Sequence, residues 1–155
     1  VQNIVIGGAA GAFPPVIGQV CATGYIGLES LVLFLIIFIW TPPHFWALAL
    51  IKKEDYAAAK IPMLPIIAGD MVTRKYILYY SVALIPCSLL PWVLGFSGNI
   101  YLAISSILGL EFLRRAFIIY KEVTGSEKTM FLYSIFYLSI LFAVVCVDKF
   151  ISNYY

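Results

Sequence analysis

Charged residues are scarce in this chain, and their scarcity is the first guide to its class. Lysine, arginine, aspartate and glutamate together make up 12% of the 155 residues, whereas 63% are hydrophobic and the mean hydropathy is +0.97. Soluble domains contain about 25% charged residues and rarely expose large apolar patches. The composition therefore excludes an ordinary soluble fold and predicts a protein surrounded by lipid.

The few cysteines and the small net charge also do not indicate a function. Cys21, Cys87 and Cys146 lie far apart in apolar segments without metal-ligand spacing, so we expect them to pack as small hydrophobic residues. The net charge of +2 gives no electrostatic reason to expect nucleic-acid binding. No charged segment of a signal peptide precedes the first apolar run, and the chain begins inside it, so we expect a fragment of a longer protein.

Five apolar segments are long enough to cross a bilayer, which takes about 20 helical residues. Since backbone polar groups in lipid need internal partners and no alternating pattern indicates a β-barrel, we expect an all-α, polytopic transmembrane helix bundle. The single membrane domain, 1–155, would contain spans at about 4–26, 30–51, 76–96, 100–119 and 130–150, with a cytoplasmic loop at about 52–75.

The basic residues predict the orientation of these spans. Nine of the ten lie in or beside the connections that follow the second and fourth spans, and only Lys149 lies at the opposite side. By the positive-inside rule these connections face the cytoplasm, or the matrix of a mitochondrion.

Prolines and small residues predict irregular, closely packed helices. Each proline removes a backbone donor and clashes with the preceding turn, so we expect the first three spans to be interrupted. Gly7, Gly8 and Gly11 would let a neighbouring helix approach the first span closely. The prolines concerned are Pro14, Pro15, Pro42, Pro43, Pro86 and Pro91.

The only histidine, His44, lies within the second span. An ionisable residue at membrane depth is a candidate for function. Alternatively, His44 has a structural role, in which its imidazole N–H donates a hydrogen bond to the carbonyl of Phe38 or Ile39. The prolines at 42 and 43 leave these carbonyls without a backbone donor. If the helix continues unbroken, the eleven residues from His44 to Asp55 make about three turns, so both side chains point the same way about 16 Å apart.

Acidic and basic residues alternate directly after this span, at Lys52, Lys53, Glu54, Asp55 and Lys60. Carboxylates can hold Mg²⁺ on a substrate phosphate and lysines can neutralise the remaining phosphate charge. The alternative is an ordinary basic loop that obeys the positive-inside rule.

A second charged group, farther along, has a structural explanation. Glu111 and Arg115 are spaced to pair on one helix face. We therefore interpret them as a structural pair near the inner interface.

Four motifs occur in an order that resembles a known family. They are NIVIGGAAGAFPP at 3–15, TPPHFWALA at 41–49, EDY at 54–56 and IPMLP at 61–65. This series resembles the protohaem IX farnesyltransferases, or haem O synthases, a family of UbiA-type intramembrane prenyltransferases. The resemblance implies the carboxyl-terminal half of a nine-helix fold in a bacterial inner membrane, with a mitochondrial inner membrane as the alternative.

The resemblance also implies a reaction and its site. The farnesyl group of farnesyl diphosphate would pass to a vinyl group of haem b, with addition of water, to give haem O. Asp55, with Glu54, would hold Mg²⁺; Lys52 and Lys53 would assist the diphosphate. His44 would contact the porphyrin, its iron or the attacking water. Asn3 would line the substrate cavity.

The chain departs from the family pattern in two places. The first acidic motif of the family, in the amino-terminal half, is absent, so we expect the 155-residue chain to be inactive alone. Lys60 occupies a position where the family has glycine. The alternatives to an enzyme are a membrane transporter, suggested by proline-broken helices around an ionisable residue, and a non-catalytic truncated remnant.

Overall fold

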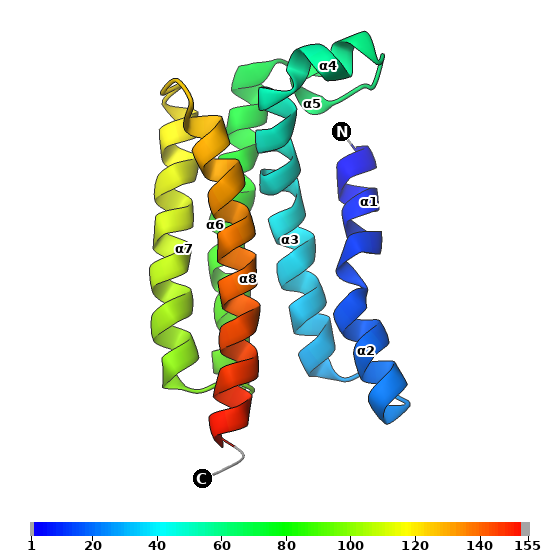
Figure 1. The fold of residues 1–155 in the computed structure, drawn as a ribbon, viewed down its shortest axis with the longest axis vertical. Coiled ribbons are helices and arrows are strands. Elements are labelled where there is room, and N and C mark those ends of the chain that lie inside the picture. The colour runs from blue at the N-terminus through cyan, green and yellow to red at the C-terminus, as the bar shows by residue number, and fades with distance from the viewer. Residues whose placement is uncertain (1, 153–155) are drawn as a thin grey trace.

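The computed structural model describes residues 2–152, with side chains for residues 4–150, and this part of the chain contains helices and no strand. Long helices run up and down the molecule, and two short ones cover one end (Figure 1). The eight helices are α1 (Gln2–Ala12), α2 (Pro14–Thr23), α3 (Leu28–Ile51), α4 (Lys53–Ala58), α5 (Leu64–Ile67), α6 (Asp70–Val93), α7 (Asn99–Tyr120) and α8 (Ser126–Ser152).

Helix α3 is the centre of the bundle. It packs against α6, against α8 and, on its remaining side, against α1 and α2, while α7 packs between α6 and α8. Helices α4 and α5 lie at the same end as the turn between α7 and α8 (Figure 1). The two basic connections therefore share one end of the molecule, which we call the basic end.

The protein is an α-helical membrane bundle. Four segments, Ile4–Thr23, Leu28–Ile51, Asp70–Val93 and Ser126–Phe150, are long and apolar enough to cross a membrane. They coincide with four of the five expected spans. The expected span at 100–119 forms α7, which is 22 residues long but contains Glu111, Arg114 and Arg115 in its second half. We propose α7 as the fifth span because it packs along α6 and α8.

Most of the expected helix interruptions are wrong. Helix α3 continues through Pro42 and Pro43, and α6 continues through Pro86 and Pro91. Pro42 and Pro43 are buried, so neighbouring helices surround the altered turn and exclude lipid from it. Of the expected proline interruptions, only the one at Pro14 and Pro15 occurs. These prolines open the new helix α2 after Phe13, in positions whose N–H groups have no helical partner anyway.

The loop at the basic end is shorter than expected. Helix α6 begins at Asp70 rather than near residue 76, and α4 and α5 occupy much of the segment before it. Gly69 precedes α6 with a φ of 85°, a left-handed conformation that favours glycine.

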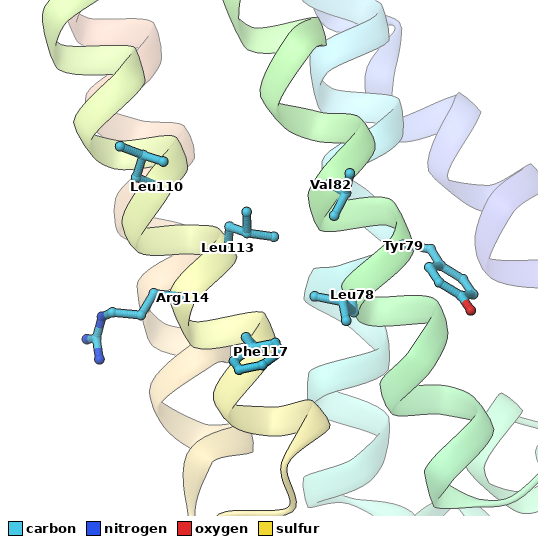
Figure 2. A pocket seen from close by; sticks show the side chains of 7 residues that line it. All are labelled: Leu78, Tyr79, Val82, Leu110, Leu113, Arg114 and Phe117. Atoms are coloured by element: carbon cyan, nitrogen blue, oxygen red, sulfur yellow. The ribbon is translucent and has the colours of Figure 1, made fainter.

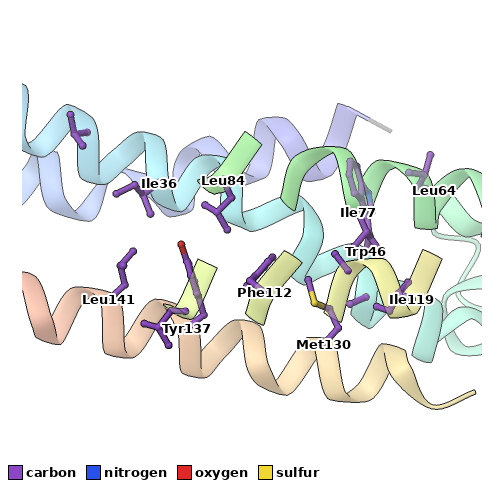
Figure 3. Packing of buried hydrophobic residues seen from close by; sticks show 14 of the residues in the cluster. Ile36, Trp46, Leu64, Ile77, Leu84, Phe112, Ile119, Met130, Tyr137 and Leu141 are labelled. Atoms are coloured by element: carbon purple, nitrogen blue, oxygen red, sulfur yellow. The ribbon is translucent and has the colours of Figure 1, made fainter. Parts of the chain in front are cut away.

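Buried side chains from α3, α6, α7 and α8 form one continuous core (Figure 3). Trp46 of α3, Ile77 of α6, Phe112 of α7 and Tyr137 of α8 are each at most 1% exposed. The rings of Phe112 and Tyr137 lie 4.9 Å apart between centroids. This core fixes the face of α3 that carries the central candidate residue, His44.

Ion pairs occur near both ends of the bundle, including one between two helices and two within α7. Lys149, the one basic residue at the far end, pairs with Glu29 of α3 at 2.8 Å. Glu111 pairs with Arg115 at 2.7 Å, as the sequence predicted, and also with Arg114 at 2.6 Å. Exposed pairs of this kind contribute about 0–1 kcal/mol each, so they order the helix ends more than they stabilise the fold.

Candidate functional site

The acidic and basic cluster of the sequence forms a small helix over the end of α3. Helix α3 ends at Ile51, and Lys52 (φ −104°, ψ 26°) separates it from α4. Lys52, Lys53, Glu54 and Asp55 line a mostly polar cavity of about 320 Å³ together with the last turn of α3. The helix from His44 to Asp55 is therefore not continuous, and the condition under which both side chains would point the same way is not met, because the helix breaks at Lys52.

Lys52 and Lys53 each already have a carboxylate partner. Lys52 pairs with Asp55 at 3.0 Å, and both side chains are more than half exposed. Lys53 pairs with Asp70 at 2.7 Å and thereby ties α4 to the start of α6. A pair as exposed as Lys52–Asp55 costs little to separate, so both groups remain available to a charged ligand.

The carboxylates fit part of a magnesium site. Glu54 and Asp55 are exposed neighbours at the start of α4. Mg²⁺ commonly takes one or two protein carboxylates and completes its shell with water and substrate phosphates. Within the described part of the chain no group of three or more histidine, cysteine or acidic side chains is placed to hold a metal. These two residues would thus supply only part of the coordination shell.

An apolar cavity lies beside this polar cluster. It measures about 320 Å³ and is lined by Ile4 and Gly7 of α1, Phe45 of α3, Tyr56 of α4 and Met63. Tyr56 comes from the same short helix as Asp55, so one helix contributes to both the polar and the apolar surface. One cavity thus offers a polar surface and the other an apolar surface.

The His44 side chain faces α8 rather than the two cavities at the basic end. Its Nδ1 lies 2.7 Å from the Ser134 hydroxyl on α8, and its ring is stacked between Trp40 and Phe131, at centroid distances of 4.4 and 4.7 Å. It therefore does not serve the carbonyl of Phe38 or Ile39 through Nδ1. Neither of the two cavities at the basic end is lined by His44.

The hydrogen bonds around Ser134 determine the form of the imidazole. The Ser134 hydroxyl donates to the Phe131 carbonyl at 2.6 Å, a bond that uses its only proton. His44 Nδ1 must then donate to the same hydroxyl oxygen, and a neutral ring keeps its lone pair on Nε2. The Trp40 indole N–H also donates to the Ser134 carbonyl, which holds α3 and α8 in register.

The remaining predicted residue is Asn3. It lies in α1, but its side chain is outside the part of the chain whose side chains are described. Ile4, the next residue, lines the apolar cavity.

Comparison with known proteins agrees with these features. A family model described as the UbiA prenyltransferase family matches residues 1–142. The chain belongs to the UbiA prenyltransferase family. Its relatives include three proteins named protoheme IX farnesyltransferase. They come from Brucella anthropi, Parvibaculum lavamentivorans and Brucella ovis and are 52%, 51% and 50% identical to this chain, respectively.

These alignments cover 98%, 96% and 93% of this UbiA family chain, but 50%, 48% and 48% of the relatives. The chain thus spans about half the length of the curated relatives that it matches. No solved structure matches it.

Several site residues could not be found from the sequence. Ser134 is 90 residues from His44, and only the packing of α8 on α3 brings them together. Phe45, Tyr56 and Met63 line the apolar cavity; each lies in one of the quoted motifs, but nothing in its local sequence indicated a role in lining a cavity. The Pro-Pro-His-Phe-Trp motif lies within α3, but it did not show that consecutive residues face different helices.

Proposed function

We propose that this chain is the carboxyl-terminal half of an enzyme of a bacterial inner membrane that transfers a farnesyl group from farnesyl diphosphate to haem b. The bond from the farnesyl allylic carbon to the diphosphate oxygen would break, and a haem vinyl carbon would bond to that allylic carbon. Water would then add to the resulting cation and lose a proton, giving haem O. The names of the relatives support this reaction, as does the presence of a polar and an apolar cavity to which the same helix, α4, contributes.

The observation that carries the proposal is the position of α4. Its first turn presents Glu54 and Asp55, and Tyr56 of the same helix lines the apolar cavity. A prenyl diphosphate has the same two parts, an anionic head and a hydrocarbon tail. Glu54 and Asp55 would hold Mg²⁺, which when bound would neutralise charge developing on the departing diphosphate.

Lys52 and Lys53 have a second role in this proposal. Their present partners are carboxylates, at 3.0 Å in Lys52–Asp55 and 2.7 Å in Lys53–Asp70. When Asp55 turns to the metal, Lys52 would be released to contact a diphosphate oxygen. The apolar lining around Phe45 and Tyr56 would exclude water from the cationic tail. Asn3, at the start of α1, would line the same cavity.

His44 would act on the haem side. With Nδ1 committed to Ser134, its Nε2 lone pair can contact the porphyrin, bind the iron or accept a proton from the attacking water. The Trp40 and Phe131 rings stacked on the imidazole would hold it in one orientation.

Replacement of Asp55 in the full-length protein tests the proposal. Asp55→Asn keeps the size of the side chain and removes its charge, so we expect haem O formation to fall by about 10²-fold or more. Lys128→Gln, an exposed change on α8 at the same end, should leave the rate unchanged. Wild-type haem O formation by Asp55→Asn would contradict the assignment, as would haem O synthesis by the 155-residue chain alone.

A further inference from the structure

A cavity of about 540 Å³ lies on the outer surface of the bundle, away from the proposed catalytic site. Leu78 and Val82 of α6 form one wall, and Leu113 and Phe117 of α7 form the other (Figure 2). Its volume is within the range of about 300–1,000 Å³ typical of ligand cavities. In a membrane, this groove would face lipid.

Two lysines stand where the groove meets the basic end. Lys75 precedes Leu78 and Val82 by three and seven residues on α6, so all three share one helix face. Lys121 follows Phe117 by four residues, and its ammonium group lies 4.8 Å from the centre of the Phe117 ring. Because α6 begins and α7 ends at the basic end, each wall of the groove terminates in a cation (Figure 1).

The nearby carboxylates are engaged elsewhere. Arg74 pairs with Glu122 at 3.4 Å and with Glu127 at 3.0 Å. Within the described residues, neither Lys75 nor Lys121 forms an ion pair. The groove therefore ends in two lysines whose charges no ion pair of the described residues neutralises.

We propose that this groove binds an anionic phospholipid, with an acyl chain between α6 and α7 and the phosphate between Lys75 and Lys121. The seven residues from Lys75 to Val82 rise about 10 Å along the helix, so the lysines lie at one end of the apolar walls, as a headgroup requires. Basic sites between helices near the inner interface are typical binding places for anionic lipid headgroups.

A second surface groove provides an internal comparison. The cavity of about 240 Å³ formed by Ile37, Leu138, Ser139 and Phe142 also lies between two helices, but no charged residue lines it. The groove between α6 and α7 is also lined by Arg114, but that guanidinium is paired with Glu111 at 2.6 Å. Lys75 and Lys121 lie beyond the lining, at the basic end, and these two lysines distinguish this groove from the second one. This site does not depend on the proposed catalytic function.

The test uses full-length protein in phosphatidylcholine nanodiscs that contain a trace of phosphatidylglycerol with a diazirine in its acyl chain. We expect photolabel on Val82 and Leu113, and less labelling by about fivefold in Lys75→Gln or Lys121→Gln, since each lysine near a lipid headgroup contributes on the order of 1 kcal/mol. Lys128→Gln removes the same charge at the same end and should keep wild-type labelling. Val82→Trp fills the groove and should prevent labelling with both lysines intact.

Three results would overturn the proposal. Equal loss of label in Lys128→Gln would show only general attraction to a basic surface. Equal labelling by a phosphatidylcholine probe would exclude headgroup recognition. Displacement of the label by farnesyl diphosphate, or crosslinking between two protein copies through Cys introduced at Val82, would assign the groove to a different occupant.

Discussion

The contact between Gly8 and Thr41 determines how closely α1 approaches α3, and hence the shape of the apolar cavity. A methyl group added at Gly8 would lie 2.9 Å from the Cγ2 of Thr41 and 3.2 Å from its Cβ. Thr41 is 5% exposed and its hydroxyl donates to the Ile37 carbonyl at 2.7 Å, so its side chain has little freedom to move. Gly8→Ala should therefore push the two helices apart.

The expected loss of stability in Gly8→Ala can be measured against a matched variant on the same helix. Overpacking typically costs about 1–3 kcal/mol, whereas glycine to alanine within a helix gains about 1 kcal/mol. Gly11→Ala has the same helix gain and meets no atom within 4 Å. The two variants should differ in free energy of unfolding by about 1–3 kcal/mol, with Gly8→Ala the less stable.

The assay is SDS-induced unfolding of the protein in bicelles, followed by tryptophan fluorescence. Thr41→Ser removes the obstructing Cγ2 methyl and keeps the hydroxyl, so Gly8→Ala should cost at least about 1 kcal/mol less in that background. Equal stability of Gly8→Ala and Gly11→Ala, or a cost unchanged by Thr41→Ser, would refute this reasoning.

Three further predictions concern other elements. Lys60 has a φ of 54°, so Lys60→Gly should be more stable than Lys60→Ala by about 1 kcal/mol in the same unfolding assay, and equal stabilities would contradict this. His44 is the only histidine of this chain, so ¹⁵N NMR can report which nitrogen of its neutral imidazole carries the proton. That proton should reside on Nδ1, and Ser134→Ala should give a mixture of the two tautomers. Protonation of Nε2 in the wild type would be inconsistent with the hydrogen bonds. The buried Asp148 accepts from the Gly98 N–H before α7, so Asp148→Ala should lower the free energy of unfolding by about 1–2 kcal/mol and Asp148→Asn by less, whereas an unchanged value would remove this capping role.

The long helices were predictable because the bilayer limits what a long apolar segment can form. Helix α3 follows from the apolar run before Lys52, and the Glu111–Arg115 pair follows from helical spacing. The continuity of α3 through Pro42 and Pro43 was not predictable, because it depends on helices that surround these residues only in the folded bundle.

The sequence offered candidate site residues but not their arrangement in space. The break at Lys52 turns Asp55 out of line with His44, and no local pattern distinguishes this break from a continuous helix. The Ser134 partner of His44 depends on contact between α3 and α8 across 90 residues. The φ of Lys60, in contrast, shows that this position favours glycine, the residue that the family resemblance implies there.

The central claim is that a prenyl diphosphate binds with its head at Asp55 and its tail between α1, α3 and α4. Photolabelling of the full-length protein with a farnesyl diphosphate analogue that carries a diazirine in its tail tests this claim directly. Label should appear on Phe45, Tyr56 or Met63, should increase with Mg²⁺, and should lose its Mg²⁺ dependence in Asp55→Asn. Label confined to other helices, or Mg²⁺ dependence retained in Asp55→Asn, would contradict the claim.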